Sequence, residues 1–182
     1  MTATAGRTLT TARLVLEQLR PEHAGEMVDV LADDRLYTFT GGRPPRPEHL
    51  RERYRRLAAG SPDGSETWLN WIARERGGGA VGAVQATLSG PTDRCTAHVA
   101  WVVGVPWQGR GLASEAARAV AAWLWSQGVV ELLANIHPAH TASQIVAARA
   151  GLEPTGRVVD GEQVWRATGS KSPTDGTAAR RR

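Results

Sequence analysis

The sequence predicts a mixed α/β fold in which antiparallel strands come first and a strand–helix–strand unit comes second. Two apolar, strand-like runs are joined through Gly77-Gly78-Gly79, which is typical of a hairpin. A later apolar run ends at Pro106 and is followed by a glycine-containing turn and an amphipathic helix. The run Glu131 to Ile136 follows that helix, and a crossover through the helix makes its two flanking strands parallel.

The first half of the chain is predicted to hold two helices and three strands. Pro21 suits the first turn of one helix, and Leu50, Tyr54 and Leu57 recur at helical spacing in the other. In chain order we expect a strand at 13–19, a helix from 21 to about 32, a helix at 46–59, and strands at 68–74 and 80–88.

The second half is predicted to alternate strands and helices and to close with a hairpin. Gly128 is expected to end the long helix in a left-handed conformation. Thr141 and Gln144 are spaced as a capping box at the start of the next helix. In order we expect a strand at 97–105, a helix from 111 to 127, a strand at 131–136, a helix from 141 to about 150, and a hairpin of 156–159 with 162–167 over Asp160-Gly161.

Composition bounds the class of protein. The chain has 182 residues, enough for one domain, with 41% hydrophobic and 22% charged residues, as in soluble globular proteins. No apolar run approaches the length of a membrane span and residues 1–8 lack a signal-peptide core, so we expect a cytoplasmic protein without a membrane partner. Cys95 is the only cysteine, which excludes an internal disulfide and a cysteine metal cluster, and no metal site is expected.

The positive charge is concentrated near the C-terminus. The formal net charge is +4, but Lys171 and Arg180 to Arg182 lie in a segment, 168–182, that is rich in small and polar residues. Residues 1–8 and 168–182 are predicted to be disordered, the latter as a basic tail. Without that tail the chain is nearly neutral, so its charge does not indicate a nucleic-acid partner and none is expected.

The turn at Gln108 to Ala113 predicts a binding site for a phosphate group. Gly109 and Gly111 allow backbone N–H groups to approach a ligand closely, and the following helix presents its unpaired first N–H groups to the same anion. The nucleoside triphosphate loop is excluded because it needs a lysine, and none precedes Lys171. A dinucleotide site fits poorly, because the expected acid, Glu131, begins a strand instead of ending one. An ordinary glycine turn stays an alternative.

This turn resembles the signature of the GNAT superfamily of N-acetyltransferases, Gln/Arg-x-x-Gly-x-Gly/Ala. Trp107 to Ala116 is similar in detail to the branch that contains the ribosomal-protein N-terminal acetyltransferases (RimJ/RimL-like), sharing Gly109, Gly111, Ala113 and Glu115. The resemblance implies a GNAT domain over 9–167, with a central, mostly antiparallel twisted sheet of six to seven strands, a splayed parallel pair and about four helices. It also implies acetyl-CoA as co-substrate, bound by Val103, Val105, Gln108, Gly109, Arg110, Gly111, Leu112, Ala113, Ser114, His140 and Ser143.

Two candidates for proton transfer come from the same resemblance. Relatives commonly read Asn-x-x-Ser before the later helix, and here His140 and Ser143 take those places. The Ser143 hydroxyl is expected to protonate the departing thiolate, unless it is merely a first-turn residue. His98 falls where close relatives often carry a glutamate, and an imidazole is poised to accept the proton of an amine. A strand histidine bonded to a neighbour or to solvent is the alternative for His98.

The acceptor is the least defined partner. Tyr37, Trp68, Trp71 and Trp101, together with Phe39, are candidates to line its pocket, although aromatic residues at strand spacing are often core. Asp33, Asp34 and Glu66 are candidates to attract an ammonium group. We expect an N-acetyltransferase that acts on a primary amine, either a protein N-terminus or a small molecule. A non-catalytic acyl-CoA-binding module is the alternative, and a homodimer is possible.

Overall fold

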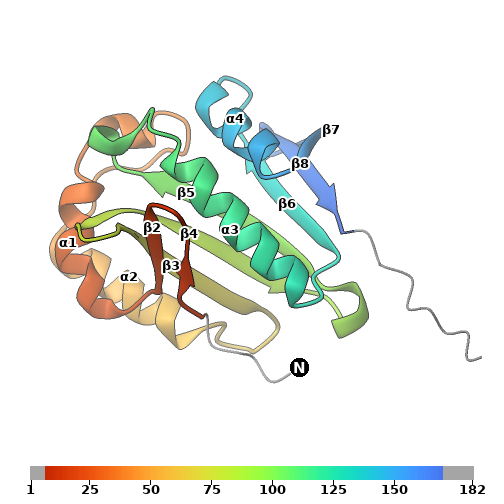
Figure 1. Cartoon of the computed structure of the whole chain (residues 1–182), viewed down its shortest axis with the longest axis horizontal. Coiled ribbons are helices and arrows are strands. Elements are labelled where there is room, and N and C mark those ends of the chain that lie inside the picture. Colours follow the sequence, from red (N-terminus) through yellow and green to blue (C-terminus); the bar gives the residue numbers. More distant parts are fainter. Residues whose placement is uncertain (1–6, 170–182) are drawn as a thin grey trace, which may run out of the picture.

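The computed structural model describes residues 7–169 and forms one eight-stranded sheet, in the order β1-β2-β3-β4-β5-β6-β8-β7 (Figure 1). Every neighbouring pair is antiparallel except β5 and β6, which are parallel. The strands are β1 (Leu9–Thr10), β2 (Leu14–Gln18), β3 (Thr67–Glu75), β4 (Ala80–Ser89), β5 (Thr96–Val103), β6 (Glu131–Ile136), β7 (Glu153–Val159) and β8 (Glu162–Thr168). The mixed α/β fold expected from the sequence is confirmed.

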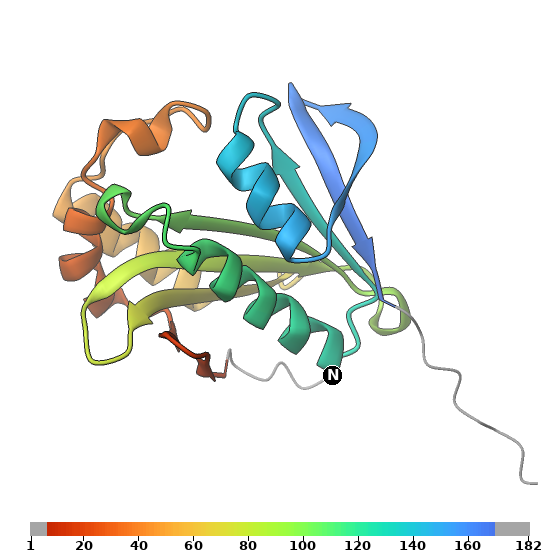
Figure 2. The same ribbon diagram turned by 45° about the horizontal axis from the view of Figure 1, so that its top comes forward.

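Two pairs of helices cover the two faces of this sheet. They are α1 (Ala24–Val30), α2 (Pro47–Ala59), α3 (Leu112–Ser126) and α4 (Thr141–Arg149), with short 3₁₀ turns η1 (Pro21–His23), η2 (Asp34–Tyr37), η3 (Thr92–Arg94) and η4 (Val105–Trp107). α3 connects β5 to β6 and packs across β5, β4 and β2, and α4 lies beside it in Figure 2. α1 and α2 pack on the opposite face, because Ile72 and Ala80 contact them whereas Trp71 and Val81 belong to the α3 side.

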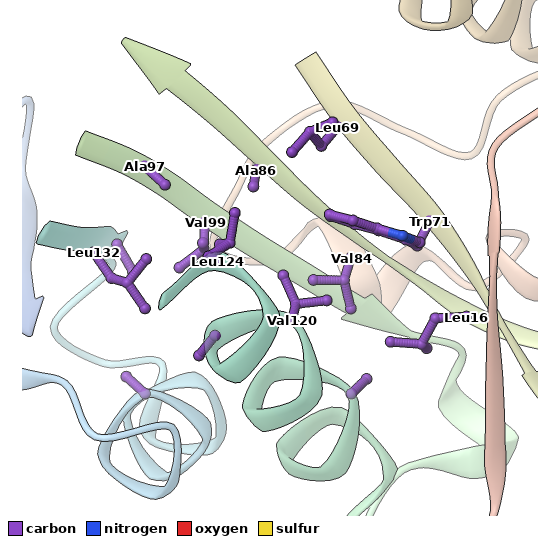
Figure 3. Close-up of a cluster of buried hydrophobic side chains, with 14 of the residues drawn as sticks. Leu16, Leu69, Trp71, Val84, Ala86, Ala97, Val99, Val120, Leu124 and Leu132 are labelled. Carbon is purple, nitrogen blue, oxygen red and sulfur yellow. The ribbon is translucent and has the colours of Figure 1, made fainter. Parts of the chain in front are cut away.

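The larger core lies between the sheet and α3 (Figure 3). Leu112, Ala116, Val120 and Leu124 are buried at three- and four-residue intervals, which places one apolar stripe of α3 on the strands. Trp71 is fully buried on this side, with its ring 5.5 Å from that of Trp123 at an edge-to-face angle. Cys95 is buried in the same cluster, and burial raises the pKa of its thiol.

The sequence predictions hold for most elements. β6 has the predicted limits, and Gly128 ends α3 with φ +84°. Asp160 and Gly161 have positive φ in the closing hairpin, as its turn requires. The predicted strand 97–105 is two residues too long, because β5 ends at Val103 before the 3₁₀ turn η4.

Three sequence predictions are corrected. The sheet has eight strands instead of six to seven, because Leu9–Thr10 adds an edge strand too short to give a periodic pattern. The capping box is wrong, because His140 is the N-cap of α4 and the Gln144 amide donates to the Pro138 carbonyl at 2.6 Å. Thr168 belongs to β8, paired with Glu131, and not to a disordered tail. The rest of the predicted tail, from residue 170, and residues 1–6 lie outside the described part.

The parallel pair separates soon after it forms. β5 and β6 are in register only from Thr96 to His98, opposite Glu131 to Leu133, although both strands continue beyond these residues. β6 remains paired with β8 along its whole length. The sheet therefore splits between β5 and β6 beyond these residues. Within residues 7–169, no helix is long and apolar enough to cross a bilayer.

Candidate active site

The separation of β5 from β6 opens into a cavity of about 910 Å³. Its walls come from both faces of the sheet. On the α3 face they include Trp101, Leu112 and Ser114, and on the α2 face Tyr54 and Ala100. The N-terminal end of α3 and the start of α4 both contribute to its lining. A single cavity therefore extends from the N-terminus of α3 to the side chains of α2.

The turn before α3 presents a row of free N–H groups to this cavity. Gly109 and Gly111 have φ of +72° and +77°, a backbone conformation that favours glycine. The first helical hydrogen bond is donated by Glu115 N to Gly111 O. Within the described part of the chain, the N–H groups of residues 109–114 have no hydrogen-bond acceptor. Together with the helix dipole, they form a site suited to an anion.

Side chains from three elements hold this turn in place. The Gln108 amide donates to the Val103 carbonyl at 2.9 Å, which fixes the turn to the end of β5. The Arg13 guanidinium donates to the Arg110 carbonyl at 2.9 Å and to the Glu115 carboxylate. Arg110 itself forms an ion pair with Glu75 at 2.6 Å. The Arg110 side chain is thus held at the end of β3, while the backbone of the turn lines the cavity.

The open edge of β5 supplies further main-chain donors. Cys95 O accepts from Val130 N on the β6 side, and Gly104 N donates to Val81 O on the β4 side. Because N–H and C=O groups of a strand alternate between its two edges, these bonds direct the N–H groups of Trp101 and Val103 toward β6. β6 is no longer paired at that level, so both groups face the gap.

An aromatic stack closes one side of the cavity. The ring of Phe39 lies 4.5 Å from the ring of His140, nearly parallel to it, and 5.2 Å from the ring of His137. Phe39 and His140 both line the cavity. Burial lowers the pKa of His140, and the charge of His137 lowers it further. His140 is therefore neutral at pH 7, and its buried Nδ1 has no hydrogen-bond partner in the described residues.

Most predicted binding residues lie together at this cavity. Eleven of them line it: Tyr37, Trp71, Trp101, Val103, Gln108, Gly109, Gly111, Leu112, Ala113, Ser114 and His140. Val105 and Arg110 are adjacent to it but do not line it. The two residues expected to transfer protons also lie outside the lining. His98 is exposed on β5, within the paired segment, and Ser143 is half-buried on another side of α4.

Several acceptor-site predictions are corrected by the contacts of the side chains. Trp71 is a core residue, with its Nε1–H donated to the Arg7 carbonyl. Trp68 lies outside the lining and donates to Glu66, whereas Trp71 contributes to the lining from the core although its indole N–H is already bonded. Asp33 is bound by the Arg35 guanidinium at 2.7 Å, and Asp34 lies outside the lining.

The structure adds lining residues that sequence reasoning missed. Arg53 and Tyr54 come from α2, Asn70 from β3, Gln85 from β4, and Thr141 and Arg149 from α4. Asn70, Gln85 and Ala100 are neighbours across β3, β4 and β5. No local motif marks these residues, but a polar Asn70 between the apolar Leu69 and Trp71 was a signal that the sequence analysis did not use.

The fold of this chain is similar to the folds of known acetyltransferases. An acetyltransferase of the GNAT family from Bacillus anthracis is 16% identical, with a TM-score of 0.73 over 89% of this chain and 98% of that chain. The ribosomal L7/L12 α-N-protein acetyltransferase RimL, in complex with coenzyme A, is 13% identical, with a TM-score of 0.74 over 89% and 98%. An aminoglycoside acetyltransferase in complex with coenzyme A is 19% identical, with a TM-score of 0.70 over 85% and 94%.

At these identities the structures show a common fold alone. No curated sequence is significantly similar to this one. The family described as "Acetyltransferase (GNAT) domain", however, matches residues 13–153, which is most of the chain. The protein belongs to this acetyltransferase family.

Proposed function

We propose that this protein transfers an acetyl group from acetyl-CoA to a primary amine by direct attack of the amine on the thioester. The observation that carries the proposal is the row of unpartnered N–H groups from 109 to 114, which opens onto the same cavity as the separated edge of β5. The N–H groups of residues 109–114 suit a diphosphate, and the edge of β5 suits a thioester arm. The coenzyme A complexes of RimL and of the aminoglycoside acetyltransferase support this choice of co-substrate.

The β5 edge provides the electrostatic part of the reaction. The N–H groups of Trp101 and Val103 face the gap and can donate to the thioester oxygen as it becomes anionic. The acceptor amine must be neutral to attack, yet amines in water are largely protonated at neutral pH. Bond formation from nitrogen to the acetyl carbon expels the thiolate, which takes up a proton. The site therefore needs a route for one proton away from nitrogen and one toward sulfur.

Two pairs of residues are candidates for this transfer of protons. His98 and Ser143 are the sequence candidates, but neither lines the cavity. The side chains that do line it include neutral His140 and the hydroxyl of Thr141, which begins α4. We propose His140 and Thr141, which line the cavity, as the acceptor and the donor of these protons, with His98, acting through water, and Ser143 as the alternatives.

The acceptor is proposed as either a protein N-terminal α-amine or a small-molecule amine. The loop from Trp107 to Ala116 supports the ribosomal-protein branch, to which RimL belongs. The similarity to an aminoglycoside acetyltransferase supports a small acceptor equally well. A cytoplasmic location and a homodimer are further proposals that follow from the sequence.

Two measurements test this function. A ligand that is present at one hundred times its dissociation constant should add about 2.7 kcal/mol to stability, so acetyl-CoA should raise the melting temperature. Thiol release should then depend on an added amine, and the product should gain the mass of one acetyl group. An unchanged melting temperature contradicts the co-substrate. Stabilisation without amine-dependent thiol release indicates a non-catalytic acyl-CoA-binding module.

A further inference from the structure

The part of the cavity under α2 carries positive charge and no carboxylate. We call this part the acceptor chamber and define it by the polar lining residues Arg35, Tyr37, Arg53, Tyr54, Asn70 and Gln85. Among residues 7–169, the whole cavity lining contains three arginines and neither Asp nor Glu. A site for a polycationic acceptor needs acidic groups, so this charge balance restricts the class of amine.

Arg53 is the arginine of the chamber whose charge is available. Arg35 is neutralised by Asp33, with its Nε and one terminal nitrogen bound at 2.9 and 2.7 Å. Arg53 makes no ion pair or hydrogen bond within the described residues. Its charge acts on both phenols of the chamber, since it opposes the rise in pKa that burial causes at Tyr37 and Tyr54. The guanidinium thus lies near both rings and lacks a counter-ion.

Three uncharged side chains of the acceptor chamber also lack hydrogen-bond partners within the described residues. Burial raises the pKa of Tyr54 to about 12, so its hydroxyl stays protonated and can donate a hydrogen bond. Tyr54 is only 4% exposed, lines the cavity, and its hydroxyl has no partner within the described chain. The side-chain amides of Asn70 and Gln85 are adjacent across β3 and β4 and are likewise unbonded there. Tyr54 and Asn70 are buried, whereas Gln85 is exposed. Because buried polar groups are normally hydrogen-bonded, the hydroxyl of Tyr54 and the amide of Asn70 are suited to bind a ligand in the cavity.

Coenzyme A phosphates do not account for the charge of Arg53. The free N–H groups at 109–114 lie at the start of α3, on the face of the sheet opposite α2. Arg149, on α4, faces the same cavity from the α3 side and suits a phosphate bound there. Arg53 instead lines the acceptor chamber from α2. Its side chain is exposed there, so an anionic group of the acceptor can reach the guanidinium.

We propose that the acceptor amine carries an anionic group, a carboxylate or a phosphate, which the Arg53 guanidinium and the Tyr54 hydroxyl bind. The inference rests on the proposed function and names the substrate class of the same site. Asn70 and Gln85 hydrogen-bond the polar atoms next to the anionic group. The apolar side chains around the chamber, Leu31, Leu36 and Leu57, receive the rest of the molecule.

This charge arrangement also serves the reaction. A carboxylate in the lining would stabilise the ammonium form of the acceptor and raise the pKa of its amine. The lining holds neither Asp nor Glu among the described residues, so no acidic side chain there opposes formation of the neutral amine that attacks. The anionic group of the acceptor holds the molecule at Arg53, while the amine end projects toward the β5 edge. Binding and deprotonation are thereby assigned to different ends of the acceptor.

Binding of amine-free probes tests the inference apart from catalysis. Calorimetry with coenzyme A present compares hydrocinnamate and phenethyl phosphate with the neutral hydrocinnamamide. We expect the better anion to bind about tenfold more tightly than the amide, since a charge-assisted hydrogen bond supplies that difference. Whichever of hydrocinnamate and phenethyl phosphate binds more tightly identifies the anionic group of the acceptor as a carboxylate or a phosphate. The preference should disappear in Arg53→Gln and persist in Arg56→Gln, a matched change on α2 outside the lining. Equal binding, no binding at millimolar concentration, or a preference that survives Arg53→Gln overturns the inference.

Acetyl transfer then separates this inference from the proposed function. Phenylalanine, phenylalaninamide and spermidine are compared by thiol release. Faster transfer to phenylalanine, lost in Arg53→Gln, supports both proposals. Faster transfer to spermidine or to the amide overturns the anionic acceptor and leaves the acetyltransferase standing. If acetyl-CoA binds and no amine is acetylated, the proposed catalysis fails, and the probe titrations still decide the role of Arg53.

Discussion

The carboxylate of Glu115 accepts the main-chain N–H of Arg13 at 2.8 Å and the Nε–H of the same residue at 2.7 Å. These residues join the segment before β2 to the first turn of α3. Burial alone would raise the pKa of Glu115, but hydrogen bonds from Thr11 and Arg13 bring it below its ordinary value. Arg13 therefore neutralises a carboxylate that would otherwise repel an anion from the free N–H groups beside it.

Removing the cation should weaken acetyl-CoA binding more than removing the carboxylate. In Arg13→Gln, the unpaired charge of Glu115 stays at the helix N-terminus, so we expect the dissociation constant to rise about tenfold, corresponding to about 1.4 kcal/mol. Glu115→Gln loses the same ion pair without leaving a negative charge. Calorimetry on both variants measures the contrast. Equal weakening in the two would show that the ion pair acts only by holding the turn.

The left-handed glycine of the turn should be required for both stability and binding. Gly109→Ala places a Cβ at φ +72°, and although no atom lies within 4 Å of it, the backbone strain should cost about 1–2 kcal/mol. Gly128→Ala has the same strain at φ +84°, at the far end of α3, and serves as the matched control. The melting temperature should fall in both variants, whereas the affinity for acetyl-CoA should fall only in Gly109→Ala. An affinity loss in both would indicate a general effect of destabilisation.

The sequence predicted the elements whose cause is local. The amphipathic stripe of α3, the alternation in β6 and the turn residues Asp160 and Gly161 are all visible in short windows, and the structure confirms them. The N-cap of α4 was missed because Thr141 and Gln144 have the right spacing, but the Gln144 side chain bonds to Pro138 instead. β1 was missed because a two-residue strand is fixed only by its pairing with β2.

The site was predictable where glycine and helix geometry define it, and not where distant elements meet. Gly109 and Gly111 mark the anion turn by their own conformational freedom. Arg53 and Asn70 line the same cavity only because α2 packs against β3, which no spacing in the sequence reveals. Ser143 was placed by a motif, but the helical rotation of α4 directs Ala142, Ile145 and Arg149 to the cavity instead.

The position of His98 gives a decisive test of its assignment. The side chain is exposed on β5 and outside the cavity lining, which favours the alternative that it is an ordinary strand residue. We therefore expect His98→Gln to keep kcat/KM within about twofold of the original, with the same pH profile, as for a surface substitution. Steady-state kinetics from pH 6 to pH 9 measure this. A sharp loss near neutral pH that recovers at high pH would restore His98 as the proton acceptor through water.

The stack of Phe39 on His140 should control the ionisation of that imidazole. Burial is the main cause of the lowered pKa of His140, and Phe39 covers the ring. In Phe39→Ala the pKa of His140 should rise toward 6.5, because the charged form becomes hydrated. Titration of the His140 ring by NMR measures the change. His137→Gln is the control: it removes the smaller, electrostatic cause and should raise the pKa less. A larger rise in the control would assign the shift to His137.

Protonation of His23 should destabilise the fold as the pH falls. His23 is 5% exposed, and its Nδ1 accepts from the Arg20 N–H at 3.0 Å, which requires the neutral ring. Burial lowers the pKa of His23, and the charge of Arg20 lowers it further. Glu17 opposes both effects, and the charge of Arg74 adds a smaller lowering. Because the unfolded chain binds the proton more readily, the free energy of unfolding decreases below pH 6.5, by at most about 1.4 kcal/mol per pH unit for one group.

Denaturant unfolding at several pH values tests this contribution. His23→Gln retains an acceptor for Arg20 and cannot be protonated, so the free energy of unfolding should vary less between pH 6.5 and pH 5 than in the original protein. His140 has a lowered pKa for a similar reason and contributes in the same direction, so His140→Gln is compared alongside. The two effects should add in the double variant, since the residues lie in separate parts of the fold. If His23→Gln shows an undiminished pH dependence, the loss of stability in acid comes from other groups.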